Sequence, residues 1–196
     1  MEKYLMAPLL IHKLGQEDNF RNYFSRFLKV LAVICAVAAL IVFFLGWKEL
    51  FAMSSEGMIG GIIYQLAFAL ASYLVVHCTL LRAAQAKQAV PGRPAALTVA
   101  AVVLKLSAEA WGFASILLGS GAGIYVWFAG REARYLLEKV AAFFPFLRAG
   151  DASFTGGAAL IFQGLVYGVL ALLLGYLLAE LLKSLPVGTS RTVERP

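Results

Sequence analysis

Four long apolar stretches divide this sequence, and they constrain the fold more than any other feature. They run from about Leu28 to Trp47, from about Ile59 to Leu81, within Ala95 to Phe128, and from about Ala158 to Leu182. About 20 helical residues cross a hydrocarbon core about 30 Å thick, so each stretch is long enough for one span. Outer-membrane strands would alternate apolar and polar residues, and these runs do not. The stretches therefore predict four transmembrane helices.

The composition supports the same class of protein. Hydrophobic residues make up 61% of the chain and charged residues 14%, whereas soluble domains have about 45–50% and about 25%. These values exclude an ordinary soluble domain, a disordered chain and a disulfide scaffold. We expect an all-α, polytopic membrane protein with four transmembrane helices and two amphipathic interfacial helices.

The chain is organised around one membrane domain. We expect an amphipathic leader over residues 1–27, a four-helix transmembrane domain over 28–182 and a polar tail over 183–196. Within the domain the spans are expected at about 28–47, 59–81, 96–120 and 158–182, with an interfacial helix at about 131–144. No signal peptide is expected, because a leader of mixed polarity precedes the first span.

The leader has the pattern of an amphipathic basic helix. Apolar residues recur at spacings of three and four, at Phe20, Tyr23, Phe24, Phe27 and Leu28. Polar and basic residues fill the other positions, at Arg21, Asn22, Ser25, Arg26 and Lys29. This pattern favours a helix that lies on the membrane surface and runs into the first span. A helix that binds a partner protein would have a similar pattern.

A second amphipathic helix is expected after the third span. Its apolar residues recur at helical spacing, at Ala133, Leu136, Leu137, Val140, Ala141 and Phe144. Charged residues occupy the opposite face, at Arg131, Glu132, Arg134, Glu138 and Lys139. Pro145 ends the pattern, as proline does in helices. Contact with a partner protein and contact with lipid explain this helix equally well.

Lysine and arginine are distributed unevenly between the loops. Counting Lys29, five precede the first span, one lies in the first loop, and three each lie in the second loop and the C-terminal tail. This asymmetry places both termini in the cytoplasm, and we expect the inner membrane. The third loop carries four basic residues although four spans place it outside.

Two explanations are possible for this third loop. Glu132, Glu138 and Asp151 neutralise its charges locally, or the stretch from Ala95 to Phe128 breaks at Gly119–Gly123 and turns back. We favour one long, tilted helix.

Lys105 and Glu109 form the strongest candidate site. They lie four residues apart and therefore on one helical face. An ionisable residue inside a span costs at least about 2.5 kcal/mol at the membrane centre, which makes it a functional hypothesis. An ion pair that only fixes helix packing is the simpler interpretation.

The second span carries several polar residues. Gln65, Ser72 and Thr79 recur every seven residues, which is more typical of interhelical hydrogen bonds than of a substrate path. His77 lies near its cytoplasmic end, and His12, in the leader, is the only other histidine. A haem held by two histidines is therefore disfavoured, and we expect no cofactor.

Small residues form the clearest packing signal. In the fourth span they recur at helical spacing, at Gly164, Gly168, Ala171, Gly175 and Ala179. Shorter small-residue pairs occur at Gly119 and Gly123 and at Gly57 and Gly61. Such faces allow helix backbones to approach closely in a membrane. The pattern does not say whether the partner helix belongs to the same chain.

Motifs for catalysis and metal binding are missing from the sequence. It has no GxxxxGK[ST], HExxH or GxSxG motif and no cluster with metal-ligand spacing. Cys35 and Cys78 form no CxxC pair, and we expect both to be buried. We therefore expect no catalytic residues and no metal.

The expected function is that of a non-enzymatic inner-membrane protein. It would be a self-associating, accessory or assembly subunit of a membrane complex, because packing residues are abundant and polar residues are scarce within the spans. Its partners would be the lipid bilayer and either further copies of itself or a larger complex. No nucleic acid is expected, since basic loops facing anionic lipid explain the formal charge of +6. The alternative is a small oligomeric transporter or channel that uses Lys105 and Glu109, with Gln65, Ser72 and His77 nearby.

Overall fold

The computed structural model describes residues 17–88, 94–141, 144–145 and 152–184. Its four long helices are α2 (Glu17–Leu50), α3 (Ser55–Ala86), α4 (Ala95–Ala129) and α6 (Phe154–Ser184). All four are long and apolar enough to cross a membrane. The structure therefore confirms a helical chain with four candidate spans, a multi-pass arrangement.

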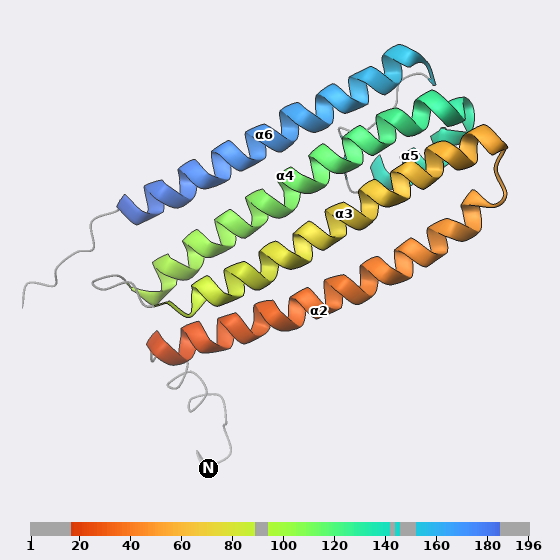
Figure 1. The fold of residues 1–196 in the computed structure, drawn as a ribbon. Helices are drawn as coiled ribbons and strands as arrows, with labels where there is room; N and C mark the ends of the chain where they lie inside the picture. Colours follow the sequence, from red (N-terminus) through yellow and green to blue (C-terminus); the bar gives the residue numbers. More distant parts are fainter. Residues whose placement is uncertain (1–16, 89–93, 142–143, 146–151, 185–196) are drawn as a thin grey trace, which may run out of the picture.

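The four helices lie side by side in chain order and form a single open layer (Figure 1). Each packs mainly against its neighbours in the sequence, so α2 and α6 are the two edges. Because consecutive helices run in opposite directions, α2 and α4 begin at the end of the layer where α3 and α6 finish. Arg26, Lys29, Lys87 and Lys183 are at this end, which we term the basic end.

α4 is one continuous helix of 35 residues, as favoured from the sequence. Gly119 and Gly123 lie within it and do not break it. A Cβ atom added at Gly119 would be 2.7 Å from the Gly164 Cα of α6, which is closer than real Cβ contacts. The absence of side chains at these glycines therefore allows the backbones of α4 and α6 to approach each other closely.

The first turns of α2 continue directly into the first span, but they bury other side chains than the sequence pattern predicts. Arg21 and Ser25 are buried together with Leu28. The Ser25 hydroxyl donates a 2.6 Å hydrogen bond to the Ala83 carbonyl of α3. Tyr23 is exposed instead. The polar positions Arg21 and Ser25 thus face the protein, which corrects our assignment of the two faces; residues 1–16 lie outside the described residues.

The chain turns back after α4. The turn contains Gly130, whose φ of 53° favours glycine, within the short helix η2 (Gly130–Glu132). The next helix, α5 (Ala133–Ala141), buries Ala133 and Leu137 in the core that also contains Tyr125.

Beyond α5, the chain still lies against α4. The Phe144 ring packs against the Trp111 ring with centroids 4.9 Å apart. Trp111 is near the middle of α4, so the segment runs back along that helix. The expected apolar face therefore packs at least partly on the protein itself.

Candidate functional site

A buried ion pair joins α3 to α4 near the basic end. The Arg82 Nε atom donates a 2.9 Å hydrogen bond to Glu109 Oε2, and a second guanidinium nitrogen contacts Glu109 Oε1. Their side chains are only 11% and 8% exposed. Such two-point pairing fixes both the distance and the orientation of the two groups.

Two further side chains extend this pair into a network. Tyr176 of α6 accepts a 2.8 Å hydrogen bond from Arg82 and donates one to Glu109. The remaining guanidinium nitrogen donates to the amide oxygen of Gln85, one turn further along α3. Arg82 therefore links three helices and is surrounded by polar partners, as a buried charge requires.

A second set of charges lies beside the first. Lys105 of α4 forms a 2.9 Å ion pair with Glu180 of α6, and Lys183 pairs with the same carboxylate at 2.6 Å. The Lys105 ammonium group also lies 5.0 Å from the centre of the Tyr176 ring. We term Arg82, Glu109, Lys105, Glu180, Lys183 and Tyr176 the ion cluster. Its three cations and two carboxylates leave one excess positive charge.

The cluster changes the interpretation of the candidate pair from the sequence. Lys105 and Glu109 lie on neighbouring turns of α4, but each pairs with a different helix. Interhelical partners satisfy both groups while joining α4 to α3 and to α6. Lys105 and Glu109 therefore form two interhelical ion pairs, which is the arrangement of ion pairs that fix helix packing.

The polar residues of α3 lie elsewhere on that helix. Gln65 is buried, and its amide lies against Gly46 of α2. Ser72 lines an apolar groove between α2 and α3. His77 is exposed and stacks on the Tyr73 ring with centroids 5.7 Å apart. None of these three residues lines the pocket described below.

Most of the small residues lie at helix contacts within the chain. A Cβ atom at Gly164 would be 2.6 Å from the Ser115 carbonyl oxygen, and one at Gly168 would be 2.7 Å from the Gly112 carbonyl oxygen. Gly175 lies against Ala108, and Gly123 against Gly157, so α4 and α6 meet along most of their length. In the same helix Ala179 is buried and Ala171 is half-buried. In α3, Gly57 lies beside Glu132 and Gly61 beside Leu50.

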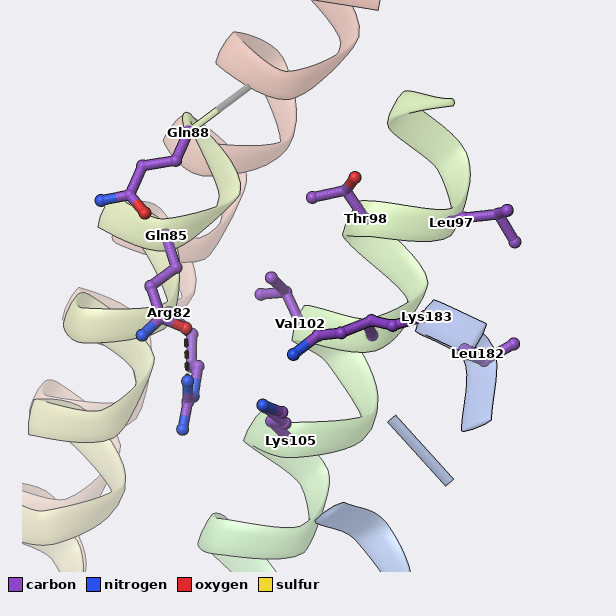
Figure 2. Close-up of a pocket in the computed structure, with 10 residues that line it drawn as sticks. Arg82, Gln85, Gln88, Leu97, Thr98, Val102, Lys105, Leu182 and Lys183 are labelled. Atoms are coloured by element: carbon purple, nitrogen blue, oxygen red, sulfur yellow. Dashed lines mark hydrogen bonds between the residues drawn. The ribbon is translucent and has the colours of Figure 1, made fainter. Parts of the chain in front are cut away.

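A pocket of about 260 Å³ opens beside the ion cluster. Figure 2 shows the side chains around it: Lys105 and Lys183 direct their amines toward the side occupied by Arg82 and Gln85 of α3. We term it the basic pocket; it is lined by Arg82, Gln85, Gln88, Leu97, Thr98, Ala101, Val102, Lys105, Leu182 and Lys183. Among these lining residues three are cationic and none is acidic. The arrangement is suited to holding an anion.

Sequence reasoning missed two central members of this site. Arg82 is one of the three basic residues that the apolar stretches place in the second loop, together with Lys87 and Arg93, whereas α3 continues to Ala86 and buries it. Tyr176 was read as part of an apolar run. Around Arg82 the structure buries Cys78, Thr79, Ala83 and Ala86, which form one helical face that continues past the expected span end. The small residues at helical spacing around Arg82 are the sequence signal that could have marked this face as a helix contact.

In the described part of the chain, no group of three His, Cys, Asp or Glu side chains lies close enough together to hold a metal ion. Comparison of the chain with protein-family models, curated proteins and solved structures gives no match. The features of the chain that bear on its function are therefore the layer, the ion cluster and the basic pocket.

Proposed function

We propose that this protein is a non-enzymatic subunit of a larger inner-membrane assembly, built from this chain with other copies or other proteins. The observation that carries the proposal is the single open layer (Figure 1). A layer of four helices has two edges and encloses no path of its own. Both edges are available to further transmembrane helices.

The exposed edges carry large apolar side chains. Phe44 of α2 and Phe162 of α6 are both 68% exposed. The small-residue faces of α4 and α6 are already used within the chain, so contacts to a partner would rely on these larger side chains. Close side-chain packing is a main source of helix association in lipid. Assembly through α2 or α6 would extend the layer without disturbing the ion cluster.

The ion cluster supports a structural contribution from the charged residues. Each carboxylate is paired, and the pairs connect α3, α4 and α6. Removing one partner of a buried pair leaves an uncompensated charge, so such a network favours one relative placement of its helices. A subunit needs this fixed placement if its edges are to present a constant surface.

The charge distribution supports a cytoplasmic basic end and cytoplasmic termini. Arg26, Lys29 and Lys87 are exposed at that end, where lysine and arginine favour the cytoplasmic side. At the opposite end Arg134 pairs with Glu138 at 3.1 Å. Local pairing of this kind supports the first explanation for the basic third loop.

Photo-crosslinking at the two edges tests the assembly proposal. The photoreactive amino acid p-benzoylphenylalanine would replace Phe44 or Phe162, with replacement of the fully buried Tyr125 as the control. We expect a discrete protein–protein product from at least one edge position and none from position 125. Native mass spectrometry would then give the partner and its stoichiometry. Crosslinks to lipid alone at both edges would contradict the proposal.

A small oligomeric transporter or channel is the second candidate. It is favoured by the presence of Arg82, Lys105 and Glu109 within candidate spanning helices. In that case Lys105→Ala combined with Glu109→Gln, which leaves Arg82 a hydrogen-bond partner, would abolish flux in vesicles while the variant still folds and assembles. If assembly and cellular function both survive the double change, the transport hypothesis for these residues fails.

A further inference from the structure

We propose that the basic pocket binds a phosphate ester, supplied either by the headgroup of an anionic phospholipid or by a soluble phosphorylated compound. The proposal concerns the space between α3, α4 and α6 and does not depend on the assembly proposed above. It is carried by the charge, position and size of the pocket and by the fixed placement of its cations.

The charges around the pocket favour an anion. Arg82, Lys105 and Lys183 line it, and the two carboxylates of the ion cluster are outside the lining. Lys105 and Lys183 both contact the carboxylate of Glu180, which keeps the two ammonium groups close together. An anion entering the pocket would meet three cationic side chains and no acidic one among the lining residues. Gln85, Gln88 and Thr98 add neutral polar groups to the same lining.

The position of the pocket suits the headgroup of a lipid. Its residues come from the last turns of α3 and α6 and the first turns of α4, at the basic end of the layer. Gln88 lies just beyond α3, and Leu97 and Thr98 are in the first turn of α4. Helix ends of spanning segments lie at the level of lipid headgroups. Basic pockets between transmembrane helices on the cytoplasmic side are a known form of headgroup site.

The lining combines cationic with apolar groups. The lining includes Leu97, Val102 and Leu182. Val102 lies beside the lysine amines in Figure 2, whereas Leu97 and Leu182 point away from them. The apolar part of the wall can contact the glycerol and upper acyl carbons of a lipid while the cations contact its phosphate. The volume of about 260 Å³ lies just below the range of about 300–1,000 Å³ for pockets that hold drug-sized ligands. It suits a small anionic group better than a large substrate.

The cations are held in place before any ligand arrives. Glu109 and Tyr176 hold Arg82, and Glu180 holds both lysines. Preorganised groups bind more tightly because less side-chain freedom is lost on binding. Arginine and lysine are also the usual partners of phosphate, arginine through a planar fork and lysine as a point charge.

Three variants of the full chain distinguish binding of an anion in the pocket from general attraction of an anion to the basic surface. Lys183→Ala and Gln88→Glu each lower the net charge by one within the lining, and Gln88→Glu leaves every member of the ion cluster intact. Lys87→Ala lowers the net charge equally at an exposed neighbouring position outside the lining. Thermal unfolding of each purified variant would confirm that it is folded.

The binding measurement uses two arms. In the first, the protein in a mild detergent is titrated with phosphatidylglycerol or phosphatidylcholine, and bound lipid is counted by native mass spectrometry. In the second, glycerol 3-phosphate is titrated by calorimetry. We expect phosphatidylglycerol to bind more tightly than phosphatidylcholine. Lys183→Ala and Gln88→Glu should each weaken this binding about fivefold, the effect of one lysine near an anionic surface, and Lys87→Ala should weaken it far less.

Each outcome either supports or overturns binding in the pocket, or identifies whether the phosphate ester comes from a lipid or from a soluble compound. Binding of phosphatidylglycerol alone, with the expected pattern among the variants, supports the lipid source. Binding of glycerol 3-phosphate with the same pattern supports a soluble phosphate ester. Equal weakening by all three variants would show only general surface attraction and would overturn the pocket. Unchanged binding in Lys183→Ala and Gln88→Glu would overturn it too.

Discussion

Gly164→Ala tests the contact between α4 and α6 most directly. The added Cβ atom would lie 2.6 Å from the Ser115 carbonyl oxygen and 2.8 Å from the Gly119 Cα atom. Both are backbone atoms of α4, so no side-chain rotation relieves the overlap. Ordinary contacts begin at 3.4 Å, and the two helices must therefore separate locally by about 0.8 Å.

The expected loss of stability follows from two opposing effects. Overpacking of a tight interface destabilises by about 1–3 kcal/mol, whereas alanine improves helix propensity over glycine by about 1 kcal/mol. The two effects leave a net fall in the free energy of unfolding of up to about 2 kcal/mol. For a chain of this size such a change lowers the melting temperature by up to about 8 °C.

Gly46→Ala is the matched control because the chemical change is the same. Its Cβ atom would meet only the far end of the Gln65 side chain, which is flexible and can turn aside. Cys78 is buried in the folded chain as expected, but Cys35 is only half-buried, which corrects the expectation for that residue. Thermal unfolding in a mild detergent can therefore be followed with a thiol-reactive dye in variants that also carry Cys35→Ala, so that the dye reports on Cys78 alone. If Gly164→Ala is as stable as Gly46→Ala, then close backbone packing does not hold α4 to α6.

Four other substitutions probe further contacts, each by the same thermal unfolding measurement. Ser25→Ala removes the hydrogen bond from α2 to α3 and should lower stability by about 1 kcal/mol; an unchanged melting temperature would show that this bond contributes nothing. Glu109→Ala strands the buried Arg82 and should cost about 3–5 kcal/mol, whereas Lys105→Ala should cost much less; the reverse order would contradict the arrangement of the ion cluster. Phe144→Ala should destabilise the chain by removing the ring contact to α4, and a neutral effect would show that the segment after α5 adds no stability.

The four spanning helices could be predicted because a membrane-spanning helix needs a minimum number of consecutive apolar residues. Such a run can be read directly from the sequence. Continuous apolar runs identify spans without knowledge of which helix packs against which. The continuity of α4 through Gly119 and Gly123 followed from the same argument, since glycine inside an apolar run often serves close helix packing rather than a break. These features needed only local sequence information.

The partners of the charged residues could not be predicted in the same way. Helical spacing brings Lys105 within reach of Glu109, but the choice between that contact and an interhelical one depends on the neighbouring helices. Arg82 and Glu180 are far from Lys105 and Glu109 in sequence, and only the order of helices in the layer brings them together. Hydropathy marks the apolar part of a helix but not its end. Arg82 was therefore placed in the loop, although it belongs to the last turns of α3.

The leader shows a different limit of sequence reasoning. A spacing of three and four residues identifies a helix with two faces but does not say which face meets the protein. We assigned Arg21 and Ser25 to the outer face because they are polar. A short hydroxyl can instead satisfy a backbone carbonyl of the next helix, as Ser25 does with Ala83. The exposed position of Tyr23 is then compatible with contact to lipid.

The order of helices in the layer also bears on how the chain assembles during synthesis. During synthesis the N-terminal part of a chain is made first, so later segments can pack against segments that are already present. Here α3 emerges beside α2, α4 beside α3, and α6 beside α4, so each new helix meets its main partner immediately. Glu109 can pair with Arg82 once α4 has been synthesised, whereas Lys105 can pair with Glu180 only after α6 has been synthesised. Completion of α6 is therefore the step that closes the ion cluster, and chains truncated before α6 would lack the Glu180 carboxylate that pairs with Lys105.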